Sequence, residues 1–272
     1  VVIVLAGVGL GTAVGLPLAW LPFGVLALAN VVSTLLGLWM ARAALRQEPP
    51  KRLRFGDISV RGLWFVLNGA ATAVAGFLVA VAISALASPE DLGYAESARI
   101  IAQPVLVFAG GLTAVLAPRA MRAGLERNAK QSRSTNRLYV TLLLGGAALY
   151  LAIVGWDWAL NPLAGLIPSA YVLGGLVALS VAANGVSALT FLQGDELAGA
   201  GRERLLAAIA SFSSVFLVAG GLTAGFTGAY ARSVGLIAGN STRFVAQQSA
   251  LRRVYANGGG PDSGPSQEPS SG

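Results

Sequence analysis

Eight apolar stretches constrain the fold of this chain more than any other feature. A helix needs roughly 20 apolar residues to cross the hydrocarbon core of a bilayer. The stretches that meet this length are 1–20, 22–45, 61–87, 94–118, 138–158, 169–193, 204–224 and 228–251. Only 11% of the residues are charged, against about 25% in soluble domains. We therefore predict an all-α polytopic membrane bundle over residues 1–256, with eight transmembrane helices in this chain.

The two ends of the sequence differ from each other. Residue 1 already lies inside an apolar run, and no basic segment precedes it. We expect the natural chain to begin upstream, so that missing N-terminal helices of the same protein pack against this part. Residues 257–272 are rich in Gly, Pro and Ser, and we expect a disordered tail there.

The residue types exclude several kinds of chemistry. The chain has no Cys and no His, which excludes disulfides, Cys/His zinc sites, cysteine nucleophiles and histidine bases. Asp157 between Trp156 and Trp158 is the one outer acid that a membrane glycosyltransferase could use. The pair Asp195 and Glu196 we interpret as a solvated helix end. We therefore expect no enzyme activity, no cofactor and no metal site.

The basic residues lie on one side of the predicted bundle. Seventeen of the 19 Lys and Arg residues lie between spans two and three, four and five, or six and seven, or follow the core of span eight. This last group contains Arg243, Arg252 and Arg253. Because positively charged loops stay inside, we predict a multi-pass protein of the bacterial inner membrane with its C-terminus in the cytoplasm. The charge of +7 is then explained by topology and by contacts with anionic membrane lipids, without nucleic acid.

Two arginines break this pattern, and both are candidate substrate-binding residues. Arg99 and Arg232 fall inside predicted spans, near their outer ends. Glu96, Arg99 and Gln103 are three and four residues apart and share one helix face. They form either a local ion pair, with Arg99 reaching toward the interface, or the wall of an outward-opening cavity that binds phosphate.

Other polar and small residues within the spans complete the set of expectations. Asn240 lies near the face of Arg232, and Asn68 lies in span three. We include both as candidate site residues, although interhelical hydrogen bonding is the more common role of Asn in a membrane. Gly235 and Gly239 predict a close helix–helix contact. Glu90 and Asp91 we place in a short outer loop, and Pro104 we expect to kink the helix that follows.

Several segments together resemble the second half of polysaccharide (O-antigen type) flippases of the multidrug/oligosaccharidyl-lipid/polysaccharide exporter superfamily. The matching features are a Pro-containing basic loop, a Gly-Tyr pair before a span that holds a proline, Pro-Arg near its end, a Gly-rich loop and a Thr-Gly-Ala start to the last span. They stand at Glu48–Arg52, Leu92–Tyr94, Ala98, Pro104, Pro118–Arg119, Gly194–Gly201 and Thr227–Ala229. Tyr94 directly follows Gly93, whereas the family has one residue between them.

The resemblance implies that these spans are the fifth to twelfth of a twelve-helix transporter. Such a protein moves a lipid-linked sugar phosphate across the membrane by alternating access, and its cationic cavity falls here on Arg99 and Arg232. Two alternatives remain open. One is a cation-coupled drug exporter, which needs an acid embedded in the membrane; every acid here lies near a helix end or in a loop. The other is a non-transporting scaffold or degenerate half-transporter.

Overall fold

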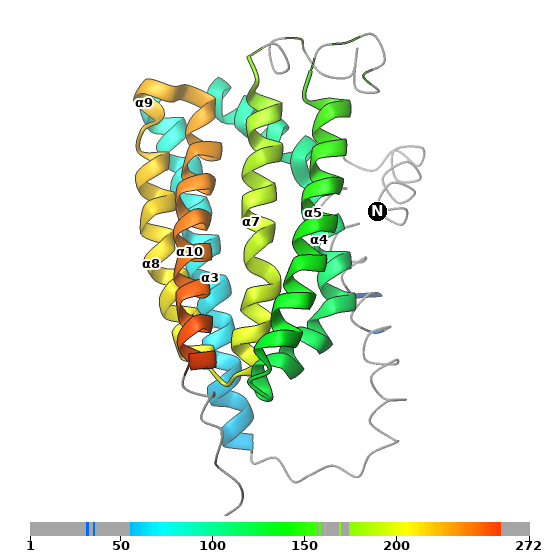
Figure 1. Cartoon of the computed structure of the whole chain (residues 1–272). Coiled ribbons are helices and arrows are strands. Elements are labelled where there is room, and N and C mark those ends of the chain that lie inside the picture. Colours follow the sequence, from blue (N-terminus) through cyan, green and yellow to red (C-terminus); the bar gives the residue numbers. More distant parts are fainter. Residues whose placement is uncertain are drawn as a thin grey trace, which may run out of the picture. The chain divides into compact units, whose positions relative to one another are not determined.

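The computed structural model describes residues 31, 32, 35, 55–156, 158, 161, 169 and 174–256. The chain divides into two compact units, Val1–Ile58 and Ser59–Gly272. Apart from the first turn of α3, the helices below belong to the second unit (Figure 1). The predicted tail 257–272 lies outside the described residues, as do spans 1–20 and 22–45 except for the helical positions Val31, Val32 and Leu35.

Every regular element in the described part of the chain is a helix. Long helices alternate in direction and are joined, where the connection is described, by short turns (Figure 1). The elements are α3 (Phe55–Leu86), α4 (Pro89–Leu125), α5 (Ala129–Val154), α7 (Leu176–Gly199), α8 (Glu203–Gly221), α9 (Ala224–Thr227), the 3-10 helix η1 (Gly228–Tyr230) and α10 (Ala231–Ala256).

Five of these helices are long and apolar enough to cross a membrane. They are Gly62–Leu86 within α3 and the whole of α4, α5, α7 and α8. The prediction of an all-α membrane bundle is therefore confirmed for the described part. α10 occupies the place of the predicted eighth span, but it does not meet the same standard of apolarity. It carries Arg232 in its first turn and Asn240, Arg243 and Gln247 further along, so the count of eight spans is not confirmed.

The helices extend beyond their apolar parts, which corrects two sequence-based boundaries. Ser88 caps α4 by accepting a hydrogen bond from the backbone N–H of Asp91 (3.0 Å). Glu90 and Asp91 therefore lie in the first helical turn, where carboxylates suit the helix dipole, and not in a loop. At its other end α4 continues through Pro118 to Leu125. The basic segment 119–137 is thus mostly helical, and its turn is only Glu126–Asn128.

α7 is the central helix of the bundle. About two thirds of its apolar window is buried (67%), whereas the next most buried span reaches 39%. Its neighbours bind it through polar bonds: Asn184 donates to the Ala102 carbonyl of α4 (2.9 Å), and the α7 carbonyl of Ala188 accepts from Tyr139 of α5 (2.8 Å). Interhelical bonds of this kind hold membrane helices together where the hydrophobic effect does not.

α8 and α10 approach each other at backbone distance, as the glycine spacing predicts. A Cβ atom on Gly220 would lie 2.3 Å from the Cα of Gly235. At Gly239 it would lie 3.0 Å from the carbonyl oxygen of Ser213. Only hydrogen atoms fit at such a contact, so the pair can pack this closely because these positions are glycine. The contact fixes the position of α10 and therefore of its arginines.

Candidate functional site

Glu96 joins two arginines from different helices at one end of the bundle. Its Oε2 lies 2.6 Å from Nε of Arg99, one turn further along α4. Its Oε1 accepts a hydrogen bond from Nη1 of Arg232, the second residue of α10. The Arg232 side chain is 17% exposed, that of Glu96 33% and that of Arg99 40%. One carboxylate and two guanidinium groups leave this Glu96 cluster with a net positive charge.

The six predicted site residues do not form one site. Arg99, Glu96 and Arg232 come together, so the local ion pair exists and a second helix shares it. Gln103 is exposed on α4 and has no hydrogen bond to the cluster. Asn240 donates to Ser187 Oγ of α7 (2.8 Å) and to its own helix at the Leu236 carbonyl. Asn240 thus has the interhelical role that is typical of such residues.

Asn68 binds Arg243, whose position along the last helix differs from the one predicted. Its Oδ1 accepts a hydrogen bond from Nη2 of Arg243 (3.0 Å), which links α3 to α10. Arg243 stands at the middle of α10 and not beyond the core of the last span. No acidic side chain in the described part of the chain pairs with it. A guanidinium group whose Nε is buried and that has no carboxylate partner is energetically costly, which makes Arg243 a functional candidate.

Arg232 and Arg243 lie on the same face of α10. They are eleven residues apart, which is about three helical turns and about 16 Å along the axis. In both side chains Nε is buried and has no hydrogen-bond partner. The spacing of eleven was the sequence signal for this pair. The sequence already places Arg243 near the face of Arg232 and Asn240, but its charge was counted with the basic residues that follow the core of the last span.

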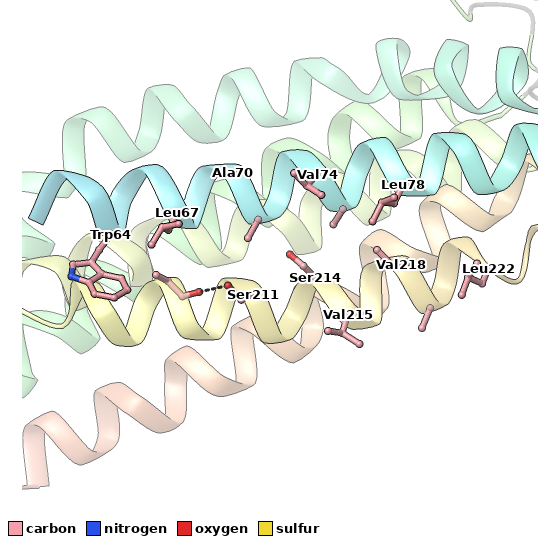
Figure 2. A pocket seen from close by; sticks show the side chains of 14 residues that line it. Trp64, Leu67, Ala70, Val74, Leu78, Ser211, Ser214, Val215, Val218 and Leu222 are labelled. Atoms are coloured by element: carbon pink, nitrogen blue, oxygen red, sulfur yellow. Dashed lines mark hydrogen bonds between the residues drawn. The ribbon is translucent and has the colours of Figure 1, made fainter. Parts of the chain in front are cut away.

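An apolar groove of about 670 Å³ lies between α3 and α8. Figure 2 shows its walls, with Trp64, Leu67, Val74 and Leu78 on one helix and Ser211 to Leu222 on the other. At the Trp64 end the guanidinium carbon of Arg204 lies 5.0 Å from the centre of the indole ring, in a cation–π contact. The groove therefore combines an apolar length with a cationic end.

Glu196 is buried, which corrects the expectation of a solvated helix end. Glu196 is 2% exposed, and its Oε1 accepts a hydrogen bond from the Tyr255 hydroxyl of α10. Burial raises the pKa of Tyr255, and the bond to Glu196 raises it further. The phenol therefore stays protonated and remains a donor. Asp195 beside it is only partly buried.

Comparison with known proteins leaves this geometry as the basis for assigning a role. No family model, no curated protein and no solved structure matches the chain. In the described part no group of three or more acidic side chains is arranged to hold a metal ion. The features available for a function are therefore the arginines of α10, the α3–α8 groove and the buried carboxylate of α7.

Proposed function

We propose that this chain is a flippase of the bacterial inner membrane that moves a lipid-linked oligosaccharide or polysaccharide precursor by alternating access. The observation that carries the proposal is the pair Arg232 and Arg243 on one face of α10. Their guanidinium groups stand at two levels of α10, about 16 Å apart along the helix axis, so a substrate phosphate group can meet them one after the other. Guanidinium suits phosphate because its planar fork makes two bonds at once.

The α3–α8 groove supplies the second part of an amphipathic substrate site. Its wall is apolar along α3 from Trp64 to Leu78, which suits the isoprenoid chain of a lipid carrier. Leu67 lines the groove, and its neighbour Asn68 holds Arg243. The Arg243 guanidinium group and the apolar α3–α8 groove are thus reached from neighbouring residues of α3.

Substitution of the arginines tests the transport role. In the bacterium that encodes the protein, Arg243→Gln and Arg232→Gln should each lower surface polysaccharide about tenfold, because each removes a charge-assisted contact of roughly 1.5–3 kcal/mol. Lipid-linked intermediates should accumulate, as measured by mass spectrometry of lipid extracts. Arg253→Gln is the matched control, since Arg253 is exposed in the last turn of the same helix.

A normal amount of surface polysaccharide in both variants, at unchanged membrane levels, would make these arginines structural anchors. Deletion of the gene without any loss of polysaccharide would favour the scaffold alternative. The groove is tested separately with Ala71→Trp, which fills it, against Ala73→Trp on the exposed side of the same helix. We expect the first to reduce export and the second to leave it unchanged.

A further inference from the structure

A polar pocket of about 590 Å³ lies at the end of the bundle opposite the Glu96 cluster. It is formed by the start of α5, the end of α7 and the end of α10. The proposed transport function uses none of its residues. Its polar lining residues are Ser132, Arg133, Asn136, Glu196, Gln248, Arg252 and Tyr255.

The inner wall of this pocket presents hydrogen-bond acceptors. The Glu196 carboxylate is buried there, with Tyr255 donating to one oxygen and Ser132 beside it. Oδ1 of Asn136 is also buried and has no hydrogen-bond partner. A buried acceptor without a donor costs about 1–3 kcal/mol. The wall therefore favours a ligand that brings its own O–H or N–H groups.

The mouth of the pocket presents donors. Arg133 of α5 and Arg252 of α10 line it with exposed side chains. A guanidinium group only donates hydrogen bonds and pairs well with phosphate. Two guanidinium groups and the Glu196 carboxylate give the pocket a net charge of about +1. An anionic ligand with donors at one end matches both the mouth and the wall.

We propose that this pocket binds a phosphate ester that ends in free hydroxyl groups, in the membrane the headgroup of phosphatidylglycerol. The phosphate pairs with Arg133 and Arg252, and the glycerol hydroxyls donate to Asn136 Oδ1 and to Glu196. Phosphatidylethanolamine carries a donor but no net charge, and phosphatidylcholine has neither. The site should therefore bind phosphatidylglycerol most tightly, phosphatidylethanolamine next and phosphatidylcholine least. General attraction of basic residues to anionic lipid would not distinguish the two neutral lipids. This inference does not rest on the proposed transport function.

Lipid binding by the purified full chain tests the proposal. The probes are phosphatidylglycerol, phosphatidylethanolamine and phosphatidylcholine with identical acyl chains, titrated in detergent and counted by native mass spectrometry. We expect phosphatidylglycerol to bind about tenfold more tightly than phosphatidylcholine, with phosphatidylethanolamine between them. The double variant Arg133→Gln/Arg252→Gln should lose the preference for phosphatidylglycerol. Asn136→Leu should lose the preference of phosphatidylethanolamine over phosphatidylcholine.

The matched control is Arg137→Gln/Arg253→Gln, which removes two neighbouring charges outside the pocket lining. It should keep the ranking, and an equal loss in both double variants would overturn the proposal. In nanodiscs of phosphatidylcholine, binding of glycerol 1-phosphate would support the same pocket chemistry with a soluble source. Equal binding of all three lipids to the unmodified chain, without binding of glycerol 1-phosphate, would overturn it. The ranking needs no variant, so a variant that fails to fold does not decide the test.

Discussion

The two ends of the bundle use carboxylates and arginines in opposite ways. At the Glu96 end, one partly exposed carboxylate joins two arginines from α4 and α10, and the group is a cation. At the Glu196 end, the carboxylate is buried and bonded to a tyrosine, while the arginines stand exposed on helix extensions. The same residue types thus form an interhelical ion bridge at one end and a pocket with separated donors and acceptors at the other.

The largest effect should come from removing the carboxylate of the ion bridge. In Glu96→Gln the largely buried Arg232 keeps its charge and loses the partner that compensates for its burial. Breaking a fully buried pair costs about 3–5 kcal/mol. Because these side chains are 17–40% exposed, we expect about 2–3 kcal/mol after allowance for solvent screening.

Thermal unfolding of the purified protein in detergent measures this loss. Glu126→Gln is the control, since Glu126 is exposed at the end of α4. If both variants unfold at the temperature of the unmodified chain, Glu96 does not hold α4 to α10.

The next effect should come from the buried carboxylate at the other end. Tyr255→Phe removes the hydroxyl that donates to Glu196 and leaves a buried acceptor partly unsatisfied, at a cost of about 1–3 kcal/mol. Tyr94→Phe is the matched substitution, because the Tyr94 hydroxyl donates to Glu90 in an exposed pair (2.5 Å). We expect the loss for Tyr255→Phe to exceed that for Tyr94→Phe in the same unfolding measurement. Equal losses would remove the contrast between buried and exposed carboxylates.

The contrast between the two ends also shows where sequence reasoning succeeded. Of the eight spans that the long apolar runs predicted, five correspond to helices long and apolar enough to cross a membrane, because hydrocarbon thickness sets helix length. The predicted span 61–87 matches the end of α3 to within one residue, but α3 begins six residues earlier, at Phe55. Spacing of three and four placed Glu96 and Arg99 on one face, since that is a local property of a helix. The contact of Arg232 with Glu96 joins residues 136 positions apart, and no local spacing predicts such a contact.

The errors have a common physical cause. Apolarity marks where a helix crosses lipid but not where it ends, so the turns of α4 and α5 beyond the membrane were interpreted as loop. Glu196 was taken as solvated because adjacent acids at a helix end usually face water. Its burial depends on α10 covering the end of α7, which is a tertiary fact. Arg243 was counted with the basic residues beyond the core of the last span, whereas it stands at the middle of α10, which begins at Ala231.

The contribution of Tyr255 to stability should depend on pH. Tyr255 lies beyond the apolar part of α10, and its pKa is raised above the usual value of about 10. The folded state then binds the proton more tightly than the unfolded state. The contribution of Tyr255 to stability is fully present below about pH 10 and is lost as the pH rises toward the folded pKa. The difference in unfolding free energy between the unmodified chain and Tyr255→Phe should therefore shrink above about pH 10. Tyrosinate absorbance should show one fewer late-titrating phenol in the variant, and identical titrations would contradict the raised pKa.

The smallest change in stability is expected from substitutions in the two turns at the Glu196 end. Both turns end a helix with the same pair of backbone hydrogen bonds. After α4, the N–H groups of Asn128 and Arg127 donate to the carbonyls of Ala123 and Gly124. After α7, the N–H groups of Arg202 and Gly201 donate to the carbonyls of Leu197 and Ala198. The residue with positive φ is Gly201 (69°) in one turn and Arg127 (51°) in the other. A non-glycine residue in this conformation costs about 1 kcal/mol. Arg127→Gly should therefore stabilise the protein by up to about 1 kcal/mol, and Gly201→Ala should destabilise it by about the same amount. Because glycine also increases the entropy of the unfolded chain, both the gain at position 127 and the loss at position 201 should be smaller than the conformational cost alone. Chemical denaturation of the two variants measures both differences, and a loss of stability in Arg127→Gly would show that the Arg127 side chain contributes more than its backbone conformation costs.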